Sequence, residues 1–242
     1  MTTIFPATDK RDLADKVAQR FVALISEIQS GEGGAHDDGI ARVVFTGGSS
    51  GIAVLEALAS TDDAADVDWQ RIEIFFGDER NLSLADAESN EGQARGALLD
   101  KLDIPAERIH GYGLSGGTDL NERADEYSAV INKVAPAGFD IHLLGLGDDG
   151  HINSLFPNHA GLDNEADVIA VTDSPKPPAE RLSLGLSAVA HADRIWFLAA
   201  GRNKEDAVAR LVSTAGPDKS CPATLVHGRI ETLLFSDAIP AH

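Results

Sequence analysis

The chain has 242 residues, of which 43% are hydrophobic, so it can bury a sizeable core and is not a disordered protein. Its 39 acidic and 20 basic residues give a net charge of −19, which disfavours nucleic acid as a partner because that affinity comes largely from Lys and Arg on phosphates. A single cysteine excludes an intramolecular disulfide, and no apolar run reaches signal-peptide or membrane-spanning length, so we expect a cytoplasmic protein with no membrane partner.

Helix-like and strand-like patterns alternate along the chain. In order, the sequence predicts a helix over 9–30, a strand over 42–46, a helix over 51–60, a strand over 72–77, helices over 89–101 and 119–134, strands over 139–147, 166–171 and 194–201, a helix over 203–213, and a short helix with a final strand within 224–235. This alternation indicates βαβ units. We therefore predict a single α/β domain over 1–242, with a mainly parallel sheet covered by helices on both faces.

Ligands of open parallel sheets bind beyond the carboxyl ends of strands, so four segments that follow predicted strands are candidates for chemistry. The first is TGGSSG (46–51), between a strand and a helix. Gly47 and Gly48 permit close backbone approach, and the amides of Ser49 and Ser50 open the helix. Such an N-terminus binds phosphate through its unpaired N–H groups. A tight turn with a serine cap is the alternative.

The same turn resembles the cofactor turn of short-chain dehydrogenases, but two requirements of that class are not met. Position 53 is alanine where the pattern needs a third glycine. Those enzymes also need a tyrosine followed four residues later by lysine, whereas Tyr112 is followed by Gly116 and Tyr127 by Ile131. A single phosphate therefore fits better than a dinucleotide, and we expect no cofactor.

The second segment, GDER (77–80), places Asp78, Glu79 and Arg80 at the end of a strand. The planar guanidinium suits a carboxylate, a carbonyl oxygen or a phosphate. Asp78 could accept hydrogen bonds from sugar hydroxyls or act as a base. In the alternative interpretation, Asp78 caps the loop and Arg80 pairs locally.

The third segment, GLGDDGH (145–151), ends a very apolar strand in a glycine-rich turn. Histidine is the usual proton acceptor near neutral pH, so His151 is the candidate general base. Asp149 could orient its imidazole or position water. A metal bound by Asp149 and His151 is a weaker alternative, because no second cluster has ligand spacing. His142 lies inside the strand and is predicted to be a satisfied core histidine.

The fourth segment supplies positive charge. Arg181 follows a proline-rich turn, and Arg202 and Lys204 lie where a strand becomes a helix. Arg181 and Lys204, converging with the amides of residues 47–50, would complete an anion site. Surface exposure explains Lys176 equally well.

Together these blocks resemble the 6-phosphogluconolactonase family. The resemblance covers nearly the whole chain and rests on TGGSSG (46–51), GDER (77–80), ESN (88–90), GLGDDGHINSLFP (145–157), SPKPPAERLSL (174–184) and AGRNK (200–204). It implies a three-layer, Rossmann-like fold shared with glucosamine-6-phosphate deaminases. It also implies a cofactor-independent hydrolase of the oxidative pentose phosphate pathway that converts 6-phospho-D-glucono-1,5-lactone to 6-phospho-D-gluconate, and we expect no metal. By motif match, the general base falls on His151, the substrate-polarising arginine on Arg80, and the phosphate-binding pair on Arg181 and Lys204.

The chain departs from the family's pattern in three places. The chain reads Asn81-Leu82-Ser83 where Val-Pro often follows the GDER arginine, Glu88 where aspartate is usual, and Asn153 where many members carry alanine. These differences concern the shape of the substrate loop.

Two other functions fit parts of this pattern. A sugar-phosphate isomerase or deaminase of the same fold would need a carboxylate beside the histidine, yet no acid follows His151 until Asp163. A non-catalytic sugar-phosphate sensor would need no His151 and would normally carry a DNA-binding segment. We predict an enzyme with a small-molecule lactone substrate, acting as a monomer or weak homo-oligomer.

Overall fold

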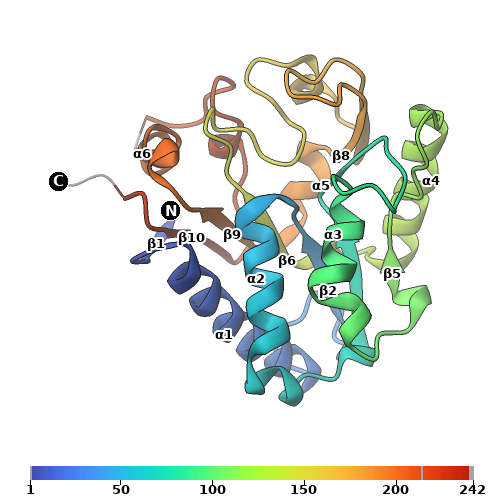
Figure 1. Cartoon of the computed structure of the whole chain (residues 1–242), viewed down its shortest axis with the longest axis vertical. Helices are drawn as coiled ribbons and strands as arrows, with labels where there is room; N and C mark the ends of the chain where they lie inside the picture. The colour runs from blue at the N-terminus through green and yellow to red at the C-terminus, as the bar shows by residue number, and fades with distance from the viewer. Residues whose placement is uncertain (1, 214, 240–242) are drawn as a thin grey trace.

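A seven-stranded parallel sheet forms the centre of the protein (Figure 1). The structure, a computed structural model, describes residues 2–213 and 215–239. The strand order is β1-β10-β9-β6-β2-β3-β5, and every neighbouring pair is parallel. The strands are β1 (Thr3–Pro6), β2 (Ala41–Phe45), β3 (Ile72–Phe76), β5 (Ile109–His110), β6 (Phe139–Gly145), β9 (Ala192–Ala199) and β10 (Glu231–Ser236). The predicted parallel sheet is confirmed.

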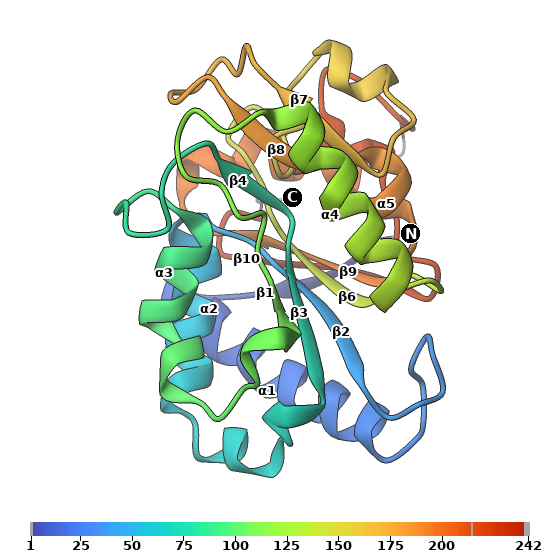
Figure 2. The ribbon, with the colours of Figure 1, turned by 90° about the vertical axis from the view of Figure 1, so that its right-hand side faces the viewer.

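Helices cover both faces of this sheet. Figure 2 shows α2 and α3 on one side of the strands and α4 and α5 on the other, and α1 packs against α2. The α-helices are α1 (Lys10–Gln29), α2 (Gly48–Ser60), α3 (Asn90–Ala97), α4 (Leu120–Val134), α5 (Leu186–Ala190) and α6 (Glu205–Val212). Short 3₁₀ segments are Asp62–Asp66, Trp69–Arg71, Leu99–Lys101, Ala106–Arg108, Ala160–Asp163, Arg202–Lys204 and Pro222–Leu225. None of the described helices is long and apolar enough to cross a membrane.

A second, three-stranded antiparallel sheet extends the fold beyond the parallel one. Its strands are β4 (Asp78–Arg80), β8 (Arg181–Leu184) and β7 (Val168–Val171), in the order β4-β8-β7. The predicted strand over 166–171 therefore exists, but it belongs to this small sheet. Residues 78–80, expected to follow a strand, form one themselves. A strand of only three residues, such as β4, shows too little periodicity to be recognised from the sequence.

Two helix boundaries differ from the prediction. The second helix begins at Gly48 instead of residue 51, because Gly48, Ser49 and Ser50 already lie in its first turn and Gly47 is its N-cap. The helix predicted over 89–101 ends at Ala97. Leu98 leaves the helical region at φ −139° and ψ −54°, and a separate 3₁₀ turn follows.

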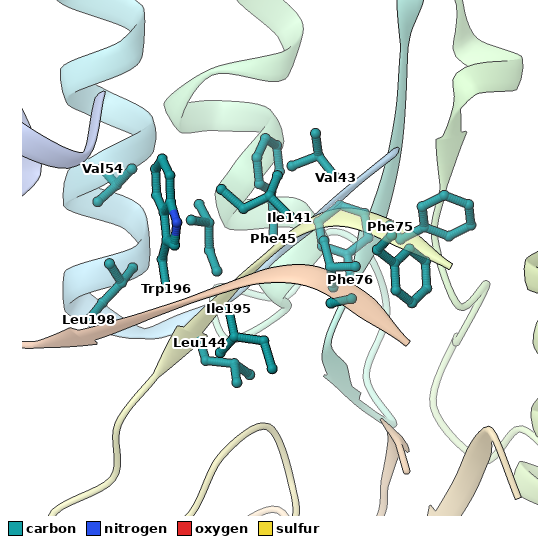
Figure 3. Close-up of a cluster of buried hydrophobic side chains, with 14 of the residues drawn as sticks. Val43, Phe45, Val54, Phe75, Phe76, Ile141, Leu144, Ile195, Trp196 and Leu198 are labelled. Carbon is teal, nitrogen blue, oxygen red and sulfur yellow. The ribbon is translucent and has the colours of Figure 1, made fainter. Parts of the chain in front are cut away.

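The core lies between the parallel sheet and its helices (Figure 3). Figure 3 shows side chains of neighbouring strands in contact, such as Ile141 of β6 and Val43 of β2, which are register partners. Phe45 and Trp196 are each 1% exposed and supply the bulk that small aliphatic residues cannot. Burying a side chain of this size stabilises the fold by roughly 1.5–3 kcal/mol, so the core is what holds the site's scaffold rigid.

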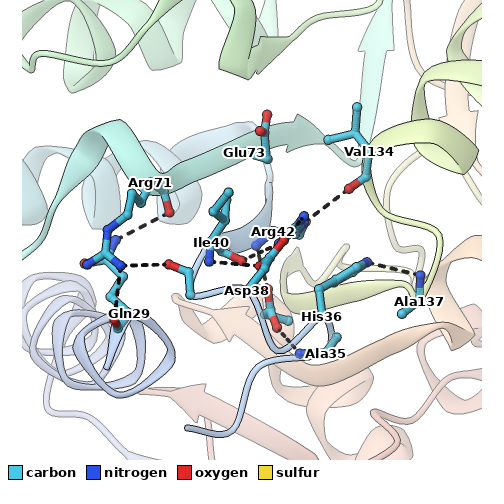
Figure 4. A network of polar contacts seen from close by, with 12 residues as sticks. Gln29, Ala35, His36, Asp38, Ile40, Arg42, Arg71, Glu73, Val134 and Ala137 are labelled. Atoms are coloured by element: carbon cyan, nitrogen blue, oxygen red, sulfur yellow. Dashed lines mark hydrogen bonds and ion pairs between the residues drawn. The ribbon is translucent and has the colours of Figure 1, made fainter. Parts of the chain in front are cut away.

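A polar network fixes the amino-terminal end of β2 (Figure 4). Asp38 accepts hydrogen bonds from the Arg42 guanidinium at 2.5 and 2.8 Å. Asp140, fully buried on β6, accepts the backbone N–H groups of Ala35 and Arg42, each at 2.6 Å. These bonds anchor the glycine-rich loop after α1, at the opposite end of the sheet from the candidate site.

His142 is fully buried on β6, as predicted, but it is not satisfied. Neither ring nitrogen has a hydrogen-bond partner among the described residues, and the Asn153 amide lies beside the ring. Burial lowers the pKa of His142 to about 3, with Asn153 opposing that decrease. The imidazole is therefore neutral at physiological pH.

This burial predicts a specific acid sensitivity. The unfolded chain, in which the pKa is about 6.5, takes up a proton before the folded one does, so His142 lowers stability progressively between about pH 6.5 and pH 3. At pH 5 the loss is about 2 kcal/mol relative to pH 7. His142→Leu should therefore lose about 2 kcal/mol less than the wild type over that interval, measured by urea unfolding. Equal losses in the two proteins would contradict the prediction.

The topology brings two turns together at one point. From β2 the sheet continues through β3 to β5 on one side, and from β6 through β9 to β10 on the other. Parallel sheets bind ligands at such a change of direction, outside the carboxyl ends of the two central strands. The turns after β2 and β6 meet there, and the Gly145 N–H donates to Thr46 Oγ1 at 3.3 Å.

Candidate active site

A cavity of about 170 Å³ opens at this point of the sheet. Nine of the ten residues that the sequence singled out line it, and the tenth, Asp149, lies just behind His151. The predicted residues on its wall are Gly47, Gly48, Ser49, Ser50, Asp78, Arg80, His151, Arg181 and Lys204. The structure thus brings together all four segments, which are up to about 160 residues apart in the chain.

The amino-terminal end of α2 forms one wall. Gly47 is the N-cap residue, and no side chain caps the helix. The serine-capped turn, our alternative interpretation, is therefore not what the structure has. Gly48 has φ +76°, a conformation that L side chains rarely adopt. The first N–H groups of α2 are left for a ligand, with the positive end of the helix dipole behind them.

Asp78 and Glu79 are adjacent in the GDER segment, but strand β4 places their side chains on opposite faces. Asp78 and Arg80 line the cavity, whereas Glu79 points to the other side, into α3. The Glu79 carboxylate accepts the N–H groups of Asn90 and Glu91 at 2.9 and 2.8 Å, and the Ser89 hydroxyl at 3.0 Å. Burial raises the pKa of Glu79, and these bonds oppose that rise. Glu79 therefore anchors the start of α3 and takes no part in the cavity.

Asp78 is held from two directions and is only 7% exposed. Asn90 Nδ2 donates to its Oδ1 at 3.0 Å, and Ser154 Oγ donates to its Oδ2 at 2.6 Å. The Ser154 N–H in turn donates to Ser183 Oγ on β8 at 3.2 Å. Asp78 thus joins β4, α3 and the turn that carries His151. Both oxygens are already engaged, which favours a fixed hydrogen-bond acceptor over a proton-transferring base.

Two arginines face each other across the small sheet. Arg80 on β4 and Arg181 on β8 are direct register partners. Like charges placed opposite each other on antiparallel strands repel, unless an anion lies between them. Burial lowers the pKa of the Arg181 guanidinium; the Asp78 charge opposes this decrease and the Arg80 charge adds to it. Arg80 Nε is buried without a partner among the described residues.

Arg181 also has a structural task. Its guanidinium donates to the carbonyls of Lys176, Pro177 and Pro178 at 2.9–3.1 Å, and it lies 5.7 Å from the Phe156 ring centroid. These bonds fix the proline-rich loop. Arg80 is tethered more lightly, through one donated bond to the carbonyl of Glu88. The alternative of a local pairing of Arg80 is therefore present, although the Arg80 guanidinium still lines the cavity.

Lys204 differs from Lys176. Lys204 lines the cavity and forms no ion pair with a described residue. Burial lowers the pKa of its ammonium, and the nearby Asp148 carboxylate opposes that decrease. Lys176 is outside the cavity wall, 41% exposed, and pairs with Asp148 at 2.7 Å. In a chain of charge −19, the cavity therefore gathers three cations, Arg80, Arg181 and Lys204, against one anion.

His151 is oriented by Asp149. The His151 Nδ1–H donates to Asp149 Oδ1 at 2.5 Å, and the backbone N–H of His151 donates to the same oxygen at 3.1 Å. Partial burial alone would raise the pKa of Asp149, but the bonds and charge of His151 hold it well below the usual range. A carboxylate on Nδ1 selects the tautomer whose Nε2 carries a free lone pair. No described residue hydrogen-bonds to that Nε2.

The turn beneath His151 is supported from the other side. Gly150 has φ +87°, and a Cβ added there would come within 2.5 Å of the Cys221 thiol. The Ala223 N–H donates to the Gly150 carbonyl at 3.0 Å. The Phe156 ring lies 4.9 Å from the imidazole, centroid to centroid. The position of the imidazole is therefore fixed by contacts on several sides.

The acidic residues beside His151 lie close enough together to be considered as a metal site. Ligand atoms of Asp148, Asp149 and His151 lie within 4.8 Å of one another. The two carboxylates, however, already pair with Lys176 at 2.7 and 3.8 Å, and the His151 Nδ1 already pairs with Asp149. A metal would have to displace these contacts, so the donor set fits a cation poorly.

Three polar residues to which the sequence assigned no role also line the cavity: Thr46, Asn90 and Asn153. Asn90 belongs to the ESN block, whose fixed place after GDER was the one available signal. Asn153 has φ +47°, and neither of its amide atoms has a partner among the described residues.

Known proteins resemble this chain over nearly its full length. A family model described as glucosamine-6-phosphate isomerases/6-phosphogluconolactonase matches residues 8–235. A 6-phosphogluconolactonase of Mycobacterium tuberculosis is 40% identical, over 97% of this chain and 94% of the relative. One of Streptomyces coelicolor is 38% identical, over 96% and 91%. A crystal structure of 6-phosphogluconolactonase from Thermotoga maritima superposes with a TM-score of 0.83 at 24% identity, covering 98% of this chain and 99% of that one.

Proposed function

The chain belongs to the glucosamine-6-phosphate isomerase/6-phosphogluconolactonase family, and we propose that it hydrolyses 6-phospho-D-glucono-1,5-lactone to 6-phospho-D-gluconate in the pentose phosphate pathway, with His151 as general base. The observation that carries the catalytic part is the Asp149–His151 pair at 2.5 Å, which holds His151 on the wall of a cavity with three cations and one carboxylate. A monomer or weak homo-oligomer in the cytoplasm, without nucleic-acid or membrane partners, stays our prediction.

Substrate binding begins with the phosphate. The free amides of residues 47–50, the Arg181 guanidinium and the Lys204 ammonium bind its oxygens, which relieves the unpaired charge at these side chains. With the phosphate fixed, the lactone carbonyl lies near His151 and Arg80. Positioning of this kind converts attack by water into an effectively unimolecular step.

The chemical step is a general-base hydrolysis. His151 Nε2 takes a proton from water as the water oxygen bonds to the carbonyl carbon, and Asp149 stabilises the imidazolium that forms. Arg80 stabilises the oxyanion of the tetrahedral intermediate. The bond from this carbon to the ring oxygen then breaks, and His151 returns the proton to that oxygen. The carboxylic acid product ionises, so one proton is released per turnover.

The deaminase or isomerase alternative fits the site less well. That chemistry needs a base at C2 and a carboxylate beside the histidine to assist ring opening. Asp78 is the one acid on the described cavity wall, and both its oxygens accept hydrogen bonds from Asn90 and Ser154. Asp149 is beside His151 but turned away from the cavity, onto Nδ1.

Parallel assays separate the two branches of the family. The purified protein is given freshly generated 6-phosphogluconolactone, with proton release followed, and glucosamine 6-phosphate, with ammonia release followed. We expect lactone turnover well above the spontaneous rate and no ammonia. Ammonia release without lactone turnover would overturn the proposed function.

Lys204→Ala tests the phosphate site most cleanly, because Lys204 forms no ion pair with a described residue whereas Arg181 also holds a loop. A charge-assisted hydrogen bond contributes about 1.5–3 kcal/mol, so KM should rise roughly 10- to 100-fold with kcat much less affected. Unphosphorylated glucono-1,5-lactone should show no such loss. Arg202→Ala, in the same 3₁₀ turn but outside the cavity wall, is the matched control. Equal effects of both variants on KM would contradict this assignment.

A further inference from the structure

Asn90 lies between the phosphate-binding turn and Asp78. It is the first residue of α3, is 5% exposed, and lines the cavity. Its Nδ2 donates to both the carbonyl and the Oδ1 of Asp78, at 2.9 and 3.0 Å. Because both of these atoms are acceptors, the amide has one chemically sensible orientation. The NH₂ group faces Asp78, and Oδ1 faces the other way.

The free oxygen faces Gly47. A Cβ added at Gly47 would come within 2.0 Å of Asn90 Oδ1, so this oxygen lies against the glycine backbone that begins the phosphate turn. It accepts no hydrogen bond from a described residue, yet it is not among the fully buried unpartnered atoms of the described chain. Its lone pairs are therefore reached from the cavity that Asn90 lines.

Most polar groups on the cavity wall are hydrogen-bond donors, so an acceptor such as Asn90 Oδ1 is needed for the hydroxyls of a sugar. Arg80, Arg181, Lys204 and the amides at the start of α2 are all donors, which suit a phosphate and a developing oxyanion. The hydroxyls of a sugar lactone also have protons to donate, and these need acceptors. Besides Asp78, whose oxygens already accept two bonds, Asn90 Oδ1 is a side-chain acceptor on the cavity wall that accepts no hydrogen bond from a described residue.

We propose that Asn90 determines specificity for the hydroxylated sugar ring: its Oδ1 accepts a hydrogen bond from a ring hydroxyl while its Nδ2 holds Asp78 in place. The proposal rests on the proposed function, since it names the part of the lactone that this side chain recognises. A site built to bond a hydroxyl discriminates against a substrate that lacks it, because the polar group is then left unpaired.

The test varies the enzyme and the substrate together. Wild type, Asn90→Ala and Ser154→Ala are assayed by proton release with 6-phosphogluconolactone and with its 2-, 3- and 4-deoxy analogues. Asn90→Ala and Ser154→Ala each remove one hydrogen bond to Asp78, but only the first removes the proposed hydroxyl acceptor. Ser154→Ala therefore controls for disturbance of Asp78. Thermal unfolding checks that both variants fold.

We expect the wild type to prefer the full lactone, and Asn90→Ala to reduce its preference over one deoxy analogue by about 10-fold in kcat/KM. Ser154→Ala should lower activity on all four lactones by a similar factor and leave the preference intact. A loss in Asn90→Ala that is equal for all four would show a purely structural role and overturn the proposal. Wild type without lactone turnover would instead contradict the proposed function. If Asn90→Ala does not fold, Asn90→Ser is tested against the same criterion.

Discussion

His151→Ala is expected to lower kcat for 6-phosphogluconolactone by about 10²- to 10⁴-fold, the usual contribution of a positioned general base. KM should change little, because in the proposed site the phosphate is bound by α2, Arg181 and Lys204 and not by His151. The physical reason is the free Nε2 lone pair, which the Asp149 carboxylate on Nδ1 selects. Steady-state rates by proton release, corrected for spontaneous hydrolysis, measure the effect.

His159→Ala is the matched control for that substitution. His159 also pairs with an aspartate, Asp173 at 2.7 Å, and also contacts the Phe156 ring, but it lies outside the cavity wall. It should retain kcat. If His151→Ala turned over the lactone at the wild-type rate, or if both variants lost activity equally, His151 would not be the base.

Arg80→Lys is expected to lower kcat by about 10²- to 10³-fold, although the charge is kept. A well-placed oxyanion donor contributes roughly 3 kcal/mol, and a lysine cannot reproduce the planar fork of the guanidinium. The Arg80 guanidinium lines the cavity and donates one bond, to the Glu88 carbonyl, so its remaining Nη N–H groups are available to the reaction. The effect should fall mainly on kcat, because the oxyanion exists only after water has attacked.

The control for Arg80 is Arg95→Lys. Arg95 lies on α3, pairs with Glu91 at 2.8 Å and is outside the cavity wall, so its replacement should leave kcat near the wild-type value. If Arg80→Lys raised KM without lowering kcat, Arg80 would bind the phosphate and would not stabilise the oxyanion.

Local signals were enough to pick out most of the residues that line the candidate site. The glycine turn before a helix, the histidine on a glycine turn and the charged residues after a strand each follow from short-range chemistry. They meet because the carboxyl ends of parallel strands share an edge. The apolar run of β6 and the helical spacing of apolar residues in α4 were likewise strong enough to predict the bounds of both elements to within two residues.

Contacts between residues that are far apart in the chain could not be predicted from the sequence. Arg80 and Arg181 are about 100 residues apart, and only the antiparallel pairing of two very short strands places them opposite each other. Asp78 and Glu79 have different contacts because their side chains lie on opposite faces of β4. Their hydrogen-bond partners, such as Ser154 and Asn90, belong to other parts of the fold. Likewise, the ion pair of Lys176 with Asp148 requires a loop position that no local pattern encodes.

The most direct measurement is proton release from freshly generated 6-phosphogluconolactone by the wild-type protein, with and without chelator. We expect turnover far above the spontaneous rate and no change on chelation, because the acids nearest His151 already pair with Lys176 and with the imidazole. A rate no faster than spontaneous hydrolysis would contradict the proposed function. Activity that is lost on chelation and restored by a divalent metal would contradict the metal-free mechanism.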